Sequence, residues 1–213
     1  MQTDELVDAL SRYPRPQQRL RPAAVIALAV LLAMGVEIAF SLSWLGVDDL
    51  VPRLDSYELL VKLAFASGVI AAAAIFVRDF AVPGRRVRLS PAVAALPFAL
   101  MLAFALHELG NHRLSTWPAH ADHAPWLSCL WQIAVLALPA FVILTVAVRR
   151  LAPIHLRHAG FHIGLVAGGI GAIGYALHVR EEDVVVALLA YGGAIALVAC
   201  IGAWLGSRVL KWS

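Results

Sequence analysis

The chain contains six long stretches of continuously apolar sequence, and these stretches limit what it can fold into. A membrane-spanning helix needs about 20 apolar residues, because each residue rises about 1.5 Å and the hydrocarbon core is about 30 Å thick. The stretches are not the alternating segments of a membrane barrel. The sequence therefore predicts an all-α, polytopic membrane protein, a bundle of six transmembrane helices. The predicted spans run approximately over residues 23–46, 58–77, 89–107, 126–148, 159–178 and 184–206.

The amino-acid composition also favours a lipid environment over water. Of the 213 residues, 61% are hydrophobic and 15% are charged, whereas soluble domains carry about 25% charged residues. The first apolar stretch follows a polar segment and is not followed by a small-residue cleavage site, so we expect a retained anchor rather than a signal peptide. The clustered catalytic residues of an enzyme are not visible, so we do not expect catalysis.

Basic residues lie on one side of the predicted membrane. Of the 17 Lys and Arg residues, 13 fall in the segments 12–21, 78–88, 149–157 and 208–211. The positive-inside rule places these segments in the cytoplasm. We therefore predict that both termini are cytoplasmic, with a tail over residues 1–21 and a transmembrane domain over residues 22–213.

Glycines in the fifth and sixth spans are spaced for close helix packing. Gly160, Gly164 and Gly168 form one stripe, and Gly202 and Gly206 repeat the spacing. In lipid, small residues let helix backbones approach each other closely. We favour packing within one chain over a homodimer face, which stays an alternative.

Two charged residues lie inside predicted spans. Glu37 is deep in the first span, and Lys62 is in the first turns of the second. Charges at such depth are rare and usually paired, so we predict that the two lie close enough to pair, directly or through water. We favour a structural pair. A small secondary transporter or channel that uses Glu37 and Lys62 is the alternative.

The eight histidines fall into two groups. His107, His120 and His123 lie in or near the loop after the third span and are conceivable metal ligands. Their spacing is not a recognised ligand motif, so we favour solvated loop histidines. A second group, His155, His158 and His162, lies near the cytoplasmic face, with His158 and His162 on one side of a helix. Haem ligation there lacks a facing axial ligand.

The two cysteines lie at different depths. Cys129 is about one turn below the outer face, whereas Cys200 is about 16 residues into the last span. Their depths differ by roughly 20 Å, and a disulfide needs Cα atoms within about 7 Å. We therefore expect that they do not pair. We interpret Cys200 as a small core residue and Cys129 as the better candidate for chemistry.

The N-terminal tail carries a short amphipathic pattern. Residues 3–13 predict a helix that begins near Asp4 and Glu5 and has Leu6, Leu10 and Tyr13 on one face. Such a helix is marginal alone in water and needs a surface. Because it lacks lysine, we favour a protein partner over anionic lipid.

Several ordered fragments resemble the NrsF family. They are the opening residues 1–10, residues 62–66, 83–86, 126–130 and 175–178, and the closing residues 205–212. The resemblance covers nearly the whole chain. It implies a six-span anti-sigma factor of the bacterial inner membrane, which sequesters an extracytoplasmic-function sigma factor and releases it under heavy-metal or oxidative stress. It implies no cofactor beyond a metal ion as signal, and no direct binding to nucleic acid.

The same resemblance implies roles for particular residues. The tail residues Asp4, Glu5, Leu6, Leu10 and Tyr13 would bind the sigma factor, and Cys129 and His178 would sense the signal. Family members usually carry a second cysteine after the position of His178, where this chain has Val179. Cys129 then acts alone or across a dimer, or sensing lies in the histidine-rich loops.

Overall fold

The structure is a computed structural model that describes residues 21–44, 46, 56–81, 90, 92–111, 125–178 and 184–211. Within these ranges the regular secondary structure is α-helical, and there is no strand. The all-α prediction is confirmed, and each predicted span is found as a helix with ends shifted by a few residues. The helices are α2 (Pro22–Trp44), α4 (Tyr57–Ala81), α5 (Ala92–Asn111), α7 (Pro125–Arg149), α8 (Leu156–His178) and α9 (Val184–Val209).

Five of these helices, α2, α4, α7, α8 and α9, are long and apolar enough to cross a membrane, and α5 contains the shorter apolar segment Ala92–His107. Large hydrophobic side chains cover the outside of the bundle. Leu31 is 70% exposed, Leu100 63% and Trp131 66%. A water-soluble protein rarely exposes apolar surface on this scale. The outer surface is therefore suited to lipid, and the chain is a multi-pass membrane protein.

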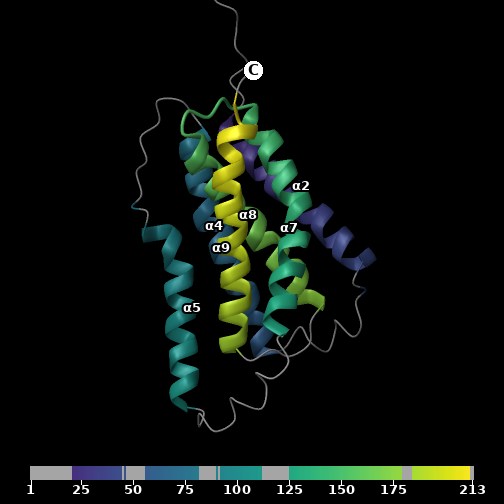
Figure 1. The fold of residues 1–213 in the computed structure, drawn as a ribbon, viewed down its shortest axis with the longest axis vertical. Helices are drawn as coiled ribbons and strands as arrows, with labels where there is room; N and C mark the ends of the chain where they lie inside the picture. The colour runs from purple at the N-terminus through teal and green to yellow at the C-terminus, as the bar shows by residue number, and fades with distance from the viewer. Residues whose placement is uncertain are drawn as a thin grey trace, which may run out of the picture.

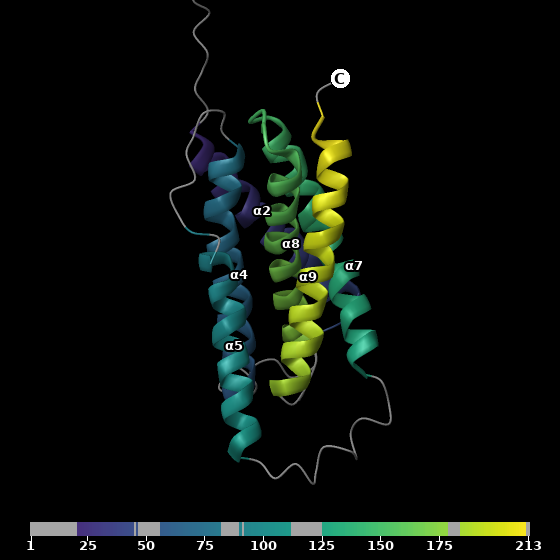
Figure 2. The same ribbon diagram turned by 60° about the vertical axis from the view of Figure 1, so that its left-hand side comes forward.

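Helix α8 is the centre of the bundle (Figures 1 and 2). In an apolar stretch of 18 residues of α8, 83% of the residues are buried, against 22% in the corresponding stretch of α2. Helices α2, α4, α7 and α9 all pack against α8, and α5 packs only at the edge, against α4 and α9. A movement of α8 would therefore change its contacts with four neighbouring helices.

Glycines explain why α8 can have so many neighbours. A Cβ at Gly164 would lie 2.6 Å from the Cα of Ala199 on α9, and one at Gly171 would lie 2.8 Å from the backbone of Ala137 on α7. Gly160 faces Gly202 in the same way. The glycine stripe is thus used within the chain, which confirms the predicted mode of packing.

Basic residues gather at one end of the bundle. Helix α2 begins and α9 ends at the same end of the molecule (Figure 1). Exposed basic residues gather there, and we call this the arginine end: Arg149, Arg150, Arg157, Arg208 and Lys211. Helix α4 also ends at the arginine end, whereas α7 begins at the opposite end (Figures 1 and 2).

Candidate functional site

Polar side chains meet inside the half of the bundle that is away from the arginine end. They come from five helices and are all at most 4% exposed. We call this set the buried polar cluster: Glu37 and Ser41 of α2, Lys62 of α4, Cys129 of α7, Tyr175 of α8 and Tyr191 of α9. Buried polar groups within a membrane bundle are costly, and they are often functional.

Cys129 and Tyr175 join α7 to α8. The Tyr175 hydroxyl donates a hydrogen bond to the Cys129 Sγ over 2.9 Å, and the cysteine is 1% exposed. Sulfur is a weak acceptor, so this contact fixes the position of the thiol more than it adds stability. The predicted candidate for chemistry is therefore a buried thiol with a defined partner.

The cluster continues from Tyr175 to α9 and α4. The rings of Tyr175 and Tyr191 meet edge to face, with centroids 5.7 Å apart. The Lys62 Nζ lies 5.7 Å from the centroid of the Tyr191 ring. A cation over an aromatic face is attracted to it, and more strongly where water is excluded. Lys62 thus has an aromatic neighbour, Tyr191, that the spacing of residues in the sequence does not indicate.

Glu37 and Ser41 join α2 to α8 at Gly174. The Ser41 hydroxyl donates to the Gly174 carbonyl oxygen over 3.0 Å. A Cβ at Gly174 would lie 2.5 Å from the Glu37 Oε1, so the carboxyl group is pressed against the glycine. Neither oxygen of Glu37 has a hydrogen-bond partner among the described residues. A direct hydrogen bond to Lys62 is therefore not formed, and pairing as a direct ion pair or through water stays a prediction.

His178 lies at the end of α8, beyond the cluster. Its Nδ1–H donates to the carbonyl oxygen of Gly46 over 3.2 Å. Gly46 has a φ of 72°, a left-handed conformation that favours glycine, two residues after α2 ends. His178 therefore ties the end of α8 to the exit of α2, whereas Cys129 ties α8 to α7.

The second histidine group lies near the arginine end. His158 and His162 share one side of α8, as predicted, and the His162 Nδ1–H donates to the His158 carbonyl oxygen over 2.8 Å. Phe80 of α4 stacks on His158 with ring centroids 5.4 Å apart, and Phe76 stacks on His162 at 4.9 Å. These rings are packing contacts between α4 and α8.

Other predicted site residues have different outcomes. The tail residues Asp4, Glu5, Leu6, Leu10 and Tyr13 lie outside the described residues, as do His120 and His123. His107 is exposed on α5. In the part of the chain that the structure describes, no three His, Cys, Asp or Glu side chains are grouped to hold a metal ion.

The interpretation of Cys200 as a core residue is wrong. Its side chain is exposed on the outside of α9. In a membrane protein hydrophobicity does not distinguish the core from the lipid-facing surface, so a small apolar residue is tolerated on either side. Both cysteines are thiols, in agreement with the expectation that they do not pair.

The buried polar cluster can convert chemistry at one atom into a change of packing. Oxidation of a thiol or binding of a metal ion to it adds volume and charge. Cys129 has almost no exposed surface, and close-packed interiors cannot absorb new volume without movement. A reaction at its sulfur would therefore move α7 relative to α8.

Comparison with known proteins shows that the chain is similar, along its length, to one group of regulators. Residues 10–212 match the family model NrsF, described as negative regulator of sigma F. The chain is 28% identical over 217 residues to the probable anti-sigma-F factor NrsF of Azospira oryzae. It is 27% identical over 214 residues to the anti-sigma-F factor NrsF of Caulobacter vibrioides. Both alignments cover 100% of each protein. No solved structure matches the chain.

Proposed function

Because the chain belongs to the NrsF family of negative regulators of sigma F, we propose that it is a membrane-embedded anti-sigma factor. It holds an extracytoplasmic-function sigma factor inactive at the bacterial inner membrane. It releases the sigma factor when a heavy metal or an oxidant acts on the bundle near the end opposite the arginines. This function needs neither catalysis nor a resident cofactor.

The full-length match carries the proposal. Two anti-sigma-F factors align with the chain over 100% of both partners, so tail and bundle are shared together. The family model begins at residue 10, so it includes Leu10 and Tyr13 of the predicted tail helix, whereas Asp4, Glu5 and Leu6 precede it. A shared tail is what a common mode of sigma-factor binding requires, because a cytoplasmic partner meets the protein outside the bilayer.

The course of the chain supports six membrane crossings with both termini in the cytoplasm. Helix α4 ends at the arginine end and α7 begins at the opposite end (Figures 1 and 2). The chain between them must therefore cross, and α5 lies in that interval. With α5 as a span, the crossings number six and the C-terminus returns to the side of the N-terminus. The basic residues then face the cytoplasm.

Helix α2 supplies a mechanical route from the signal to the tail. It follows the predicted sigma-binding residues Asp4, Glu5, Leu6, Leu10 and Tyr13 in the sequence, with residues 14–21 between, and it packs against both α7 and α8. A reaction at Cys129 changes the spacing of α7 and α8, which displaces α2 from its contact at Gly174. A shift of about 2–3 kcal/mol would weaken sigma binding roughly 30- to 150-fold.

Paired tail variants test the proposal. Leu6→Asp with Leu10→Asp places charge on the apolar face of the predicted helix, and we expect it to abolish the two-hybrid signal with the cognate sigma factor. Ser11→Asp adds one negative charge, half that of the double variant, away from that face and serves as the control. A C-terminal tag reports whether each variant accumulates in the membrane. A signal that survives the double substitution would contradict the assignment of the tail.

A further inference from the structure

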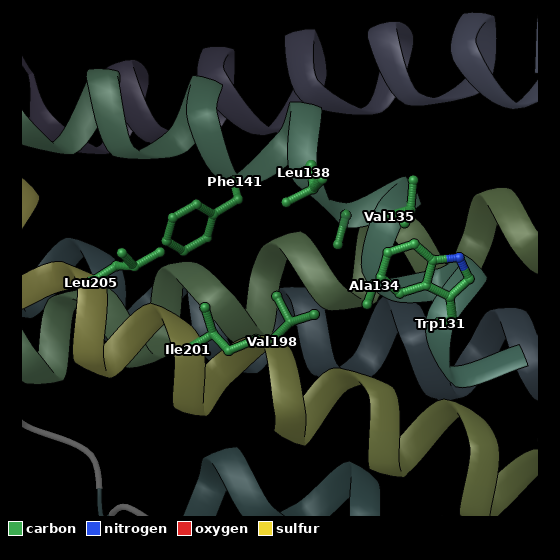
Figure 3. Close-up of a pocket in the computed structure, with 9 residues that line it drawn as sticks. Trp131, Ala134, Val135, Leu138, Phe141, Val198, Ile201 and Leu205 are labelled. Atoms are coloured by element: carbon green, nitrogen blue, oxygen red, sulfur yellow. The ribbon is translucent and has the colours of Figure 1, made fainter. Parts of the chain in front are cut away.

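Helices α7 and α9 leave a long groove on the outside of the bundle (Figure 3). Its volume is about 190 Å³, and the described residues that line it are hydrophobic. Trp131, Leu138 and Phe141 line it from α7, and Val198, Ile201 and Leu205 line it from α9. From Trp131 to Phe141 the groove follows α7 for about 15 Å. It is therefore narrow, elongated and parallel to the predicted membrane normal.

The shape of the groove suits an acyl chain better than another helix. Helices that associate in lipid meet through small residues that let their backbones approach. Here the small residues Gly160, Gly164 and Gly202 are already used between α8 and α9. The groove instead presents bulky side chains such as Leu138, which is 58% exposed, and Trp131. A flexible hydrocarbon chain can fill the irregular space between such side chains, whereas a rigid helix cannot.

Two arginines, Arg149 on α7 and Arg208 on α9, follow the groove-lining residues toward the arginine end of the bundle. Arg149 follows Leu138 by eleven residues and Phe141 by eight, and both steps return to the same face of a helix. Arg208 follows Leu205 by three residues, and its Cζ lies 3.9 Å from the centroid of the Trp204 ring. Stacking on an exposed indole holds a guanidinium in place and leaves its N–H groups available for a phosphate.

The surroundings of these arginines are positively charged. Arg150, Arg157 and Lys211 lie exposed at the same end. Within the part of the chain that the structure describes, the acidic side chain at this end is Asp79, which is 6% exposed and belongs to α4. Basic sites between membrane helices at a cytoplasmic face are suited to anionic lipid headgroups.

We propose that this groove binds one anionic phospholipid, with an acyl chain between α7 and α9 and its phosphate against Arg208 and Arg149. The site is on the outside of the bundle, and Cys129 is not among the residues that line it. It therefore does not depend on the anti-sigma function. The bound lipid would belong to the leaflet at the arginine end.

Native mass spectrometry of the full-length protein tests this site. The purified chain in mild detergent is mixed with phosphatidylglycerol or with phosphatidylcholine of the same acyl chains. We expect one phosphatidylglycerol to be retained preferentially. Replacing Arg208→Gln or Arg149→Gln should lower its occupancy by about five-fold for each arginine. Arg78→Gln, which removes the same charge from the last turn of α4, a helix that does not line the groove, should leave the occupancy unchanged.

A second variant tests the hydrocarbon part of the site. Ala134 lines the groove, and Ala134→Phe should fill it and remove the retained lipid while the helical circular dichroism spectrum stays that of the wild type. Equal retention of both lipids by the wild type would overturn the proposal. So would unchanged retention in Ala134→Phe, or a homodimer in the spectrum that Ala134→Phe abolishes, because the occupant would then be a second copy of the chain.

Discussion

Cys129 is the residue that we propose as the point at which the chemical signal acts. Its sulfur is buried between α7 and α8 and accepts a hydrogen bond from Tyr175. We predict that Cys129→Ser blunts release of the sigma factor under metal or oxidant stress without unfolding the bundle. Cys200→Ser, which changes the exposed thiol on α9, is the matched control and should respond as the wild type does. Reporter transcription from a sigma-dependent promoter measures both, and an unchanged induction curve in Cys129→Ser would remove this thiol from the mechanism.

The hydroxyl of Tyr175 has a separate, measurable role in stability. Tyr175→Phe keeps the ring that meets Tyr191 but removes the donor to Cys129. We expect a loss of about 0.5 kcal/mol in the free energy of unfolding, the lower end of the usual range for one hydrogen bond, because sulfur is a weak acceptor. Denaturation in mixed micelles measures this loss. Tyr57→Phe removes a hydroxyl from a residue that is 60% exposed and should cost less. Equal losses would mean that the contact with sulfur does not stabilise the fold.

Glu37 and Gly174 should be energetically coupled. A methyl group on residue 174 would lie 2.5 Å from the Glu37 Oε1, and the fully buried carboxyl group has little space to move away. We predict that Gly174→Ala destabilises the wild type but becomes neutral or stabilising in a Glu37→Ala background. The expected coupling energy is about 0.5–3 kcal/mol, measured by a double-mutant cycle. Additive effects would show that α2 does not contact α8 in this way.

At the scale of helices, the close contact of α8 with α9 is the most demanding packing in the bundle. A Cβ at Gly164 would lie 2.6 Å from the backbone of Val198 and Ala199, and a backbone cannot rotate out of the way as a side chain can. We predict that Gly164→Ala costs about 1–3 kcal/mol or more, since it overpacks a rigid contact. Unfolding in mixed micelles provides the measurement.

Gly35 offers the matched control on α2. A Cβ at this position meets no heavy atom within 4 Å. Gly35→Ala should therefore lie within about 1 kcal/mol of the wild type, on the stabilising side, because alanine favours helix over glycine. A comparable loss from both substitutions would indicate that glycine flexibility, rather than close approach, explains the stripe on α8.

The helices themselves were predictable because the bilayer fixes their length and composition. The predicted span 159–178 became Leu156–His178, and the span 126–148 became Pro125–Arg149. The glycine spacing also predicted close packing, since in lipid small residues are the main requirement for it. Helix faces were not predictable in the same way. Cys200 was assigned to the core and lies outside, because apolar residues are equally suited to lipid and to the interior.

The buried polar cluster was only partly predictable from sequence. Glu37, Lys62 and Cys129 stood out as polar residues in apolar stretches, whereas Tyr175 and Tyr191 looked like ordinary aromatic residues. The sequence does indicate that Tyr175 and Cys129 could meet, because the two residues lie at a similar depth when counted from the ends of their helices. Which neighbour each polar group meets depends on helix rotation, and this is why Lys62 lies near Tyr191 while Glu37 faces Gly174.

At the scale of the whole molecule, the central position of α8 makes the bundle suitable as a switch. Four helices share contacts with it, and one of them, α2, leads directly into the tail. A packed core changes between discrete arrangements rather than deforming continuously. A modification on α7 is therefore expected to reach the tail through the shared neighbour α8, without a long chain of polar contacts.

Topology decides whether such a switch can reach a cytoplasmic partner. The start of α2 and the end of α9 lie at one end of the bundle (Figure 1), so a reporter at either terminus should give the same answer. We predict that green fluorescent protein fused after Ser213 is fluorescent and that alkaline phosphatase there is inactive. Alkaline phosphatase inserted within residues 112–124 should be active, because α5 carries the chain to the other side. An inactive insertion combined with a fluorescent terminus would mean that α5 does not cross. Active phosphatase at the terminus would place the arginine end outside the cell, where no sigma factor is available to bind.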